Sequence, residues 1–154
     1  MRIAGGAPIV AAGLILSCAA LAESLPKTAT PLSKDAVTRI YSDRTAIWKD
    51  ADAYFAPDHT EKGVLGKPKT TSVFMGTWTV SGNEICVYNF HKNSPATFRD
   101  CYKYWQDGKR VVTLWSIHSD GSPVDENNGY YVGEVDKLKP GDLVSDKYAA
   151  AGGW

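Results

Sequence analysis

Three histidines, the side chains that most often act as catalytic bases and metal ligands, are scattered along the chain. His59, His91 and His118 each fall near a loop or the end of a predicted strand. Their separations do not match the spacing of two or four residues that brings two ligands to one metal ion. A site built from His91 and the thiolates of Cys86 and Cys101 lacks a fourth ligand at a usual spacing. The sequence therefore predicts neither a bound metal nor another cofactor.

Candidate catalytic groups are few. Ser119 directly follows His118, but the sequence has no G-x-S-x-G turn of the kind that exposes the nucleophile in many hydrolases. Asp43, Asp50 and Asp52 fall near the ends of predicted elements, and a glycoside hydrolase would need two such carboxylates to meet in a cleft. Ordinary solvation explains the same positions. The sequence thus predicts no catalytic residue, and a cell-wall glycan hydrolase stays an alternative.

Aromatic side chains are the one group that stands above background. In the strand predicted over 100–105, Tyr102 and Tyr104 share a face and Trp105 takes the other, because successive side chains alternate across a strand. If Cys101 faces the core, both tyrosines face outward. Outward rings on a rigid sheet can stack on sugars or anchor a protein partner. Tyr102 and Tyr104 are therefore a candidate binding surface, unless they cover the second face of the sheet or pack under the helix.

Short aromatic and β-branched runs, broken by turn residues about every eight to twelve positions, begin at Thr45 and are typical of all-β domains. The clearest strand spans 74–80, where Phe74, Gly76, Trp78 and Val80 share the inward face. Further strands are predicted over 46–48, 53–55, 85–90, 100–105, 110–117 and 130–135, and the patterns over 63–66 and 142–144 are weaker. The predicted structural core comprises Phe74, Gly76, Trp78 and Trp115.

A short helix is predicted to start after the N-cap Ser33, with Leu32 and Val37 placed to form a hydrophobic staple. We therefore predict a mainly β protein with one short N-terminal helix. Its seven to eight antiparallel strands form a meander that closes into a small barrel or roll, because curling removes exposed strand edges. The folded domain is expected over 32–144, between a flexible lead-in over 23–31 and a flexible tail over 145–154.

The first 22 residues have the layout of a secretory signal peptide. Arg2 precedes an uncharged apolar stretch over 9–16, and Ala20-Leu21-Ala22 fits an A-x-A cleavage site, so the exported protein would begin at Glu23. Lipidation of Cys18 is an alternative, although the bulky Leu16 lies where such motifs prefer a small residue. No later segment is apolar enough to cross a membrane. We therefore expect a periplasmic protein.

Signal removal would leave two cysteines, Cys86 and Cys101. In an oxidising compartment such a pair is expected to form a disulfide, which would link two neighbouring strands and fix their register. The chain has 17 basic and 17 acidic residues, so its formal net charge is zero. This balance gives no reason to expect a nucleic-acid partner or an anionic membrane surface.

Several motifs together resemble a bacterial family known as domain of unknown function 995, found mostly in alphaproteobacteria such as the rhizobia. They are Leu32-Ser33, Tyr54-Phe55-Ala56-Pro57-Asp58, Gly76-Thr77-Trp78-Thr79-Val80, Cys86, and the Cys101-Tyr102 strand that ends at Asp107-Gly108. The resemblance covers about Leu32 to Ile117, and Pro57-Asp58-His59 departs from the Asp-Gly turn that such proteins typically have. It implies an exported envelope protein of Gram-negative bacteria and brings no catalytic residues.

The sequence favours a non-enzymatic periplasmic protein that binds an envelope protein or a glycan through a face or mouth of the barrel, a class that includes inhibitor-like modules. The alternative from another class is a lipocalin-like carrier of a small apolar ligand. Gly76 and Gly133 would leave room for that ligand beside Trp78 and Trp115. A barrel interior filled by its own aromatic side chains would exclude the carrier.

Overall fold

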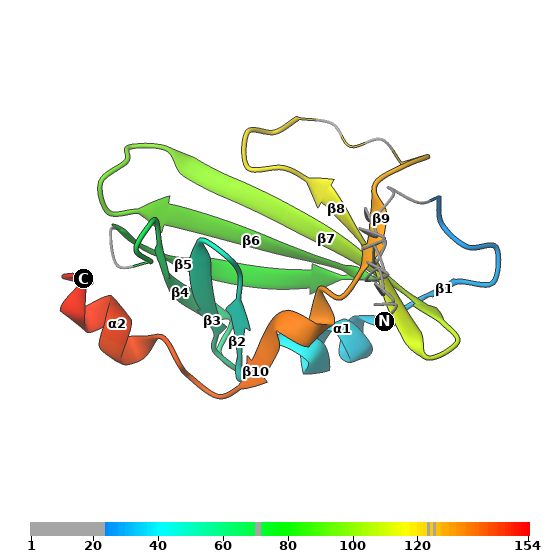
Figure 1. The fold of residues 1–154 in the computed structure, drawn as a ribbon, viewed down its shortest axis with the longest axis horizontal. Helices are drawn as coiled ribbons and strands as arrows, with labels where there is room; N and C mark the ends of the chain where they lie inside the picture. Colours follow the sequence, from blue (N-terminus) through cyan, green and yellow to red (C-terminus); the bar gives the residue numbers. More distant parts are fainter. Residues whose placement is uncertain (1–23, 70–71, 123, 125) are drawn as a thin grey trace, which may run out of the picture.

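The computed structural model describes residues 24–69, 72–122, 124 and 126–154, and Figure 1 shows their fold. The predicted signal peptide over 1–22, with Cys18, lies outside the described residues. In chain order the elements are β1 (Thr30–Pro31), α1 (Lys34–Tyr41), β2 (Arg44–Ile47), β3 (Ala51–Phe55), β4 (Thr60–Leu65), β5 (Ser72–Ser81), β6 (Glu84–His91), β7 (Thr97–Asp107), β8 (Arg110–Ile117), β9 (Tyr130–Val132), the 3-10 helix η1 (Val135–Lys137), β10 (Leu138–Pro140) and α2 (Ser145–Ala150).

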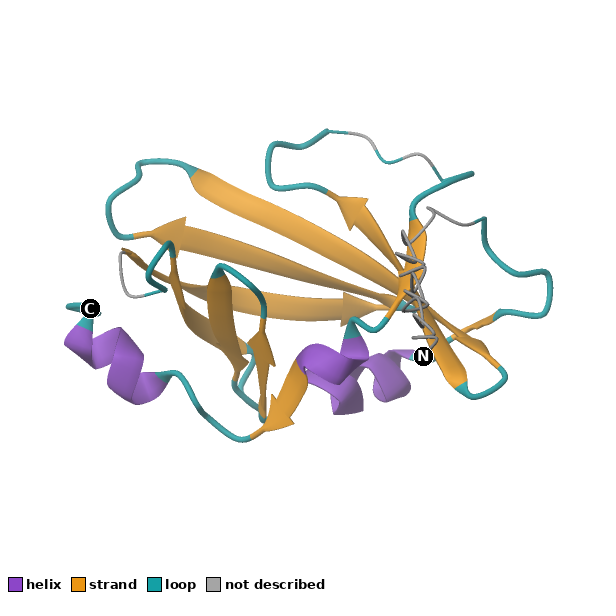
Figure 2. Ribbon diagram, viewed as in Figure 1, coloured by secondary structure: helices purple, strands orange, loops and turns teal. Residues whose placement is uncertain are grey.

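The strands form one antiparallel sheet in the order β10-β2-β3-β4-β5-β6-β7-β8-β9, and β1 pairs with β7 beside this path. From β2 to β9, each strand therefore pairs with the next one along the chain. Figure 2 shows that strands form the body of the molecule and that helices are few and short. The predicted fold class is confirmed: the protein is mainly β, and its antiparallel meander curls into a half-barrel.

The two edges of the sheet are joined by a short stretch of chain. β9 ends at Val132 and β10 begins at Leu138, so only residues 133–137, which include η1, connect the edges. A connection of this length spans at most about 20 Å. The sheet must therefore curl, and in Figure 1 the short strands β2 to β4 run across the direction of the long strands β5 to β7. The curl creates a concave face.

Side-chain alternation decides what faces the concave side. Phe74 and Trp78 of β5 are buried there, whereas Met75 and Thr77 are exposed on the convex side. The inward face predicted for β5 is thus the face that the structure shows.

Helix α1 packs across one end of the half-barrel. The Ser33 side chain accepts a hydrogen bond from the Ala36 backbone N–H at 3.2 Å, as predicted for the N-cap. Val37 and Tyr41 are buried and belong to the main core cluster, together with side chains of β2, β3, β5, β6 and β7. The helix therefore fills this end of the concave face with apolar side chains.

The segments expected to be flexible, over 23–31 and 145–154, contain β1 and α2, and their flexibility stays a prediction. β1 pairs with β7, and Leu25 packs against a cluster around Trp105 on the convex side. Helix α2 covers the convex side of β3 to β5, where its Tyr148 packs with Val64 and Val73. Both segments carry apolar side chains that cover the outer face, which composition alone does not reveal.

A buried cluster of ion pairs also connects α2 to the sheet. Asp52 is 1% exposed and accepts hydrogen bonds from Lys69 at 2.7 Å and from Lys147 of α2 at 2.8 Å. Burial opposes ionisation of Asp52, but the hydrogen bonds and charges of Lys147 and Lys69 outweigh burial and lower its pKa. The carboxylate therefore has the two positive partners that a buried charge requires.

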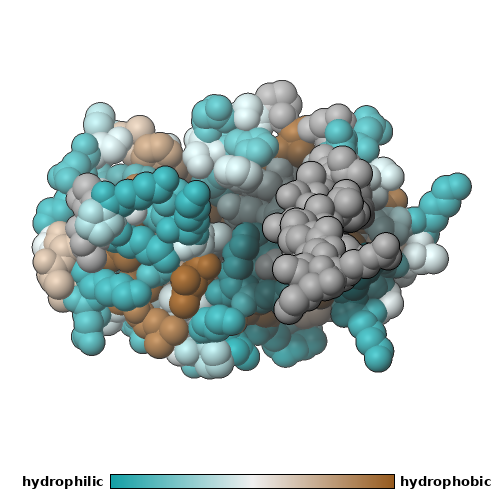
Figure 3. Space-filling model, in the orientation of Figure 1, coloured by the Kyte–Doolittle hydropathy of each residue, from teal (hydrophilic) through white to brown (hydrophobic). Residues whose placement is uncertain are grey.

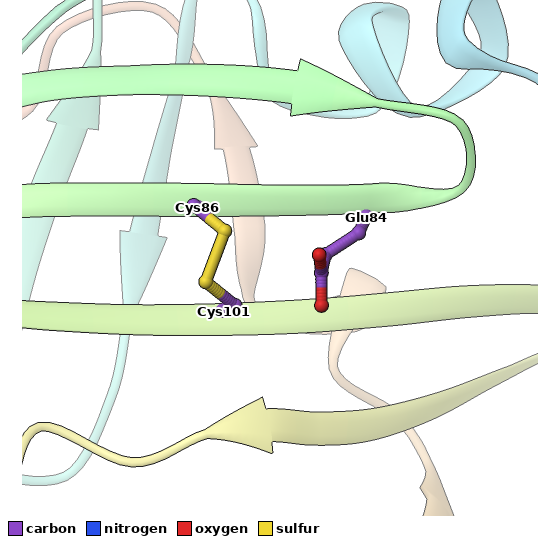
Figure 4. A group of neighbouring side chains, drawn as sticks. All are labelled: Glu84, Cys86 and Cys101. Atoms are coloured by element: carbon purple, nitrogen blue, oxygen red, sulfur yellow. A yellow bond between two sulfur atoms is a disulfide. The ribbon is translucent and has the colours of Figure 1, made fainter. Parts of the chain in front are cut away.

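Cys86 in β6 and Cys101 in β7 lie directly opposite each other and form a disulfide, with their Cα atoms 4.1 Å apart. Figure 4 shows this bridge and the neighbouring Glu84 carboxylate. The three side chains are close enough to hold a metal ion, but the sulfur atoms are bonded to each other and are not free thiolates. The bridge lies on the convex side, whereas His91 lines the concave side, so His91 cannot join these cysteines at one ion.

The face shown in Figure 3 is largely hydrophilic, with apolar side chains confined to small areas. Among the helices that the structure describes, none combines the length and the apolar character that a membrane crossing requires.

Candidate functional site

The concave face holds a cavity of about 620 Å³. The core around α1 fills one end of the half-barrel, and the cavity occupies the other end, between the start of β5, the end of β6 and the start of β7. Its lining residues are Tyr41, Trp48, Lys49, Asp50, Ala51, Phe55, Glu61, Leu65, Phe74, Val87, Asn89, His91, Phe98, Asp100, Tyr102, Trp115, Ser119, Tyr131, Glu134 and Lys137.

Three residues form a row across the sheet at this cavity. Glu61 in β4 pairs with Gly76 in β5, and Gly76 pairs with Asn89 in β6. Directly paired residues share a face, so Glu61 and Asn89 flank a position without a side chain. A Cβ at position 76 would lie 1.9 Å from the Tyr88 carbonyl oxygen and 2.6 Å from Asn89 Oδ1. Gly76 therefore leaves the space that the Asn89 side chain occupies.

Glu61 and Asn89 are buried polar side chains with unused hydrogen-bonding capacity. Glu61 is 4% exposed and Asn89 is 8% exposed. Glu61 Oε2 and Asn89 Oδ1 have no hydrogen-bond partner among the described residues. Such a buried orphan atom typically costs about 1–3 kcal/mol. A ligand that supplied the missing partners would remove this cost.

Burial is the main cause that raises the pKa of Glu61 to about 8, and the negative charge of Asp100 adds to the rise. The nearby Asn89 side chain acts in the opposite direction. Glu61 is therefore mostly protonated at neutral pH. A buried carboxylic acid with a shifted pKa in a cavity is a common feature of functional sites.

Asp100 of β7 is held in place by neighbours. It accepts a hydrogen bond from the Trp115 indole N–H at 2.9 Å and from the Ser119 hydroxyl at 2.8 Å. His91 lies nearby and stacks on Phe98 with ring centroids 4.1 Å apart. Burial lowers the pKa of His91, although the charge of Asp100 opposes the change. His91 is therefore mostly neutral at neutral pH.

Glu134 lies in the connection between the two edges of the sheet and is 4% exposed. Its carboxylate accepts hydrogen bonds from the Trp48 indole N–H and the Lys137 ammonium, each at 2.7 Å, and from the Tyr131 hydroxyl at 3.2 Å. Unlike Glu61, this carboxylate has several partners. Glu134 therefore contributes to holding the edges of the half-barrel together.

The predicted outward placement of Tyr102 and Tyr104 is wrong. Cys101 faces the convex side, so both tyrosines face the concave side, where Tyr102 lines the cavity and Tyr104 is fully buried. Tyr104 hydrogen bonds to Tyr41, and burial raises the pKa of both phenols. The Tyr102 ring stacks parallel to Trp115, with centroids 5.9 Å apart. That Tyr102 binds a ligand stays a prediction, and such a ligand would lie in the cavity and not on the outer surface.

The predicted core residues fall in two places. Phe74 and Trp78 are buried in the main core cluster. Gly76 lies between Glu61 and Asn89, which line the cavity, and Trp115 lines the cavity itself and donates a hydrogen bond to Asp100. Gly133 lies in the connection between β9 and η1 with a φ of +93°, a conformation that favours glycine.

The three aspartates considered for glycoside chemistry do not meet. Asp50 is exposed at the edge of the cavity, and Asp52 lies on the convex side under α2. Asp43 accepts a hydrogen bond from the Tyr54 hydroxyl at 2.9 Å. Asp50 lies in the turn before β3, so the alternation of that strand does not place it on the same face as Asp52.

The remaining histidines lie against tryptophan rings. The His59 ring centroid is 4.2 Å from that of Trp78, and the His118 ring centroid is 4.0 Å from that of Trp115. Ser119 Oγ is bonded to Asp100 and lines the cavity.

Sequence reasoning missed Glu61, Asn89 and Asp100. A signal was present at Asn89, because it continues the alternating inward series that Ile85 and Val87 begin in β6. A polar residue in phase with buried apolar residues is a candidate for an interior polar site.

The family model described as protein of unknown function, DUF995, matches residues 10–144 of the chain. The chain belongs to the DUF995 family. The match extends beyond the span of about Leu32 to Ile117 that the motifs covered, and it confirms the resemblance seen in them. No curated protein and no solved structure matches the chain. For this DUF995 protein, function must therefore be inferred from the geometry of the cavity.

Proposed function

We propose that this protein binds a small organic molecule with an apolar or aromatic body in the concave cavity of the half-barrel. The observation that carries the proposal is the cavity itself, about 620 Å³ in volume, whose lining includes eight phenylalanine, tyrosine and tryptophan side chains. Ligand sites in proteins commonly measure about 300–1,000 Å³ and combine apolar walls with a few polar groups. Glu61 and Asn89 are polar groups of this kind.

This proposal develops the carrier interpretation of the sequence. Aromatic side chains such as Trp78 fill only the end of the half-barrel near α1, so the interior keeps room for a ligand. The interpretation as an inhibitor-like module relied on Tyr102 and Tyr104 facing outward, and both face inward. The glycan-hydrolase interpretation relied on Asp50 and Asp52, which lie on different sides of the sheet.

Filling the cavity tests the proposal. Ala51 lines the cavity at the start of β3, and Ala51→Trp would place an indole ring in it. Met75 is 43% exposed on the convex side of β5, so Met75→Trp adds a similar ring away from the cavity. We expect Ala51→Trp to weaken binding of the neutral fluorescent dye N-phenylnaphthylamine about tenfold or more, because the site needs concave apolar space. Met75→Trp should leave dye binding unchanged.

Fluorescence titration of the purified wild type and both variants measures this effect. Circular dichroism of each variant checks that the sheet is intact. If the wild type does not bind the dye, or if both tryptophan variants bind it as the wild type does, the cavity is not a ligand site and the proposal is wrong.

We also propose that the protein is exported to the periplasm. The basis is the signal-like pattern of the first 22 residues, and the disulfide between Cys86 and Cys101 is compatible with an oxidising compartment. Expression of the full chain in a Gram-negative host should give periplasmic protein whose intact mass corresponds to a start at Glu23 and to oxidised cysteines. Recovery of the full-length chain in the cytosol with both thiols free would contradict export, and a lipid adduct on Cys18 would favour the lipoprotein alternative.

A further inference from the structure

The cavity contains more negative than positive charge. Its lining includes the carboxyl groups of Asp50, Glu61, Asp100 and Glu134 but only two lysines. Lys137 is bound to Glu134 at 2.7 Å, and Lys49 is exposed at the edge. Among the described residues, neither Glu61 nor Asp100 forms an ion pair with a lysine, arginine or histidine. Glu61 and Asp100, the two acidic groups of the lining without a positive partner among the described residues, thus face the same space.

The carboxyl groups are surrounded by aromatic rings. Phe74, Phe98, Tyr102 and Trp115 line the cavity together with Glu61 and Asp100. The faces of such rings attract cations, most strongly where water is excluded. The combination of the buried Glu61, the half-buried Asp100 and aromatic walls is therefore suited to a positively charged organic group.

A bare metal ion fits this lining less well. Three or more potential metal ligands that lie within 4.8 Å of one another occur in the described residues only at Glu84, Cys86 and Cys101, on the convex side. The acidic groups of the cavity are thus not gathered tightly enough to coordinate one small ion. They can surround a larger organic cation.

We propose that the ligand carries a protonated amine or a quaternary ammonium group, which binds at Glu61 and Asn89 within the aromatic cavity. The inference rests on the proposed function and names the class of ligand. Glu61 Oε2 and Asn89 Oδ1, both buried and without partners, would accept hydrogen bonds from an amine or surround the charge of a quaternary group. The nearby carboxylate of Asp100 would add long-range attraction.

Binding of a cation at this position should release a proton. The pKa of Glu61 is raised to about 8 in the empty cavity by burial and by Asp100. A positive charge beside Glu61 favours its ionised form and lowers that pKa. The other titratable groups that line the cavity are Tyr41, His91, Tyr102 and Tyr131, the ion-paired Glu134 and Lys137, and Lys49 and Asp50 at its exposed edge. The tyrosines and His91 are neutral near pH 7, and Glu134 and Lys137 neutralise each other.

Matched pairs of ligands provide the test. Phenethylamine and phenylbutylamine are compared with phenethyl alcohol and phenylbutanol, which have the same apolar body and no charge. We expect each amine to displace N-phenylnaphthylamine at about tenfold lower concentration than its alcohol at pH 7. Calorimetry in two buffers with different ionisation enthalpies should show close to one proton released per bound amine and none for the alcohols.

Glu61→Gln keeps the shape of the side chain and cannot ionise. This variant should lose the preference for each amine over its matched alcohol and release no proton when an amine binds. Glu84→Gln, on the convex side, is the matched control and should behave as the wild type. Equal binding of amines and alcohols, failure of both to displace a bound dye, or an amine preference that survives in Glu61→Gln would overturn the inference. If the inference about a cationic ligand fails but Ala51→Trp weakens dye binding, the proposal that the cavity binds a small organic molecule still holds. If the wild type does not bind the dye at all, both that proposal and the inference are wrong.

Discussion

Gly76→Ala is expected to destabilise the protein by about 3 kcal/mol or more, a large part of the roughly 5–15 kcal/mol by which domains are usually stable. The added Cβ would lie 1.9 Å from the Tyr88 carbonyl oxygen and 2.6 Å from Asn89 Oδ1. The first contact is with backbone, so no change of a side-chain rotamer can relieve it. The strands β5 and β6 would have to separate at the centre of the sheet.

Denaturant unfolding of the wild type and the variant measures this loss. Gly82→Ala is the control, because Gly82 lies in the β5–β6 turn at a φ of +58°, and its added methyl group would meet nothing within 4 Å. The control should lose only about 1 kcal/mol, from the unfavourable backbone conformation. Similar losses in the two variants would show that β5 and β6 do not approach as closely at Gly76 as the structure indicates.

Glu61→Gln is expected to stabilise the ligand-free protein in a manner that depends on pH. The pKa of Glu61 is raised from an ordinary value of 4.5 to about 8, chiefly by burial. Between these values the folded protein holds a proton that the unfolded chain has released, so the stability of the wild type falls as pH rises. The slope is on the order of 1 kcal/mol per pH unit, because one pKa unit corresponds to about 1.4 kcal/mol. Glutamine cannot titrate and removes this loss.

The measurement is the free energy of unfolding of both proteins from pH 5 to pH 8.5. The difference between them should be small at pH 5, grow with pH and level off above about pH 8. Contributions from His91, Asp52 and Asp142, whose pKa values are lowered, are common to both proteins and cancel in the difference. Glu84→Gln should show no such trend. A difference that does not vary with pH would mean that Glu61 is ionised in the empty cavity and that the site is wetter than the structure shows.

The two predictions concern the same row of the sheet. Gly76 has no side chain and leaves space in this row, whereas its neighbour Glu61 places there a buried carboxyl group whose ionisation is unfavourable. A protein selected only for stability would gain from an apolar residue at position 61, because burying a carboxyl group without full hydrogen bonding is unfavourable. The row therefore resembles a binding site, in which a loss of stability is tolerated because the polar groups serve the ligand.

Local patterns allowed much of the fold to be predicted. Alternation in β5 indicated which side chains face inward, because a strand with one buried face must place apolar residues at every second position. Ser33 indicated the start of α1, because its hydroxyl can accept a backbone N–H that the first helical turn leaves free. The short turns indicated an antiparallel meander, and the ordered motifs indicated the DUF995 family.

Which face of β7 turns toward the concave side could not be predicted in the same way. Alternation separates Tyr102 and Tyr104 from Cys101 and Trp105, but both sets are apolar enough to face a core. Both faces of β7 are in fact covered, because the chain that contains Leu25 packs on the convex side near Trp105. The same applies to the C-terminal residues, where α2 is fixed by Lys147 and Tyr148 meeting partners more than 70 residues away in the sequence.

By itself the sequence determined the position of most strands, the helix start, the pairing of two cysteines and the family, because each depends on neighbouring residues or on a single pair. Only the tertiary structure decided which face of β7 turns inward and that Glu61, Asn89 and Asp100 share one cavity. These residues belong to three different strands, and their side chains meet because the sheet curls between two edges joined by residues 133–137. Curvature is a property of the whole sheet, so no local pattern encodes it.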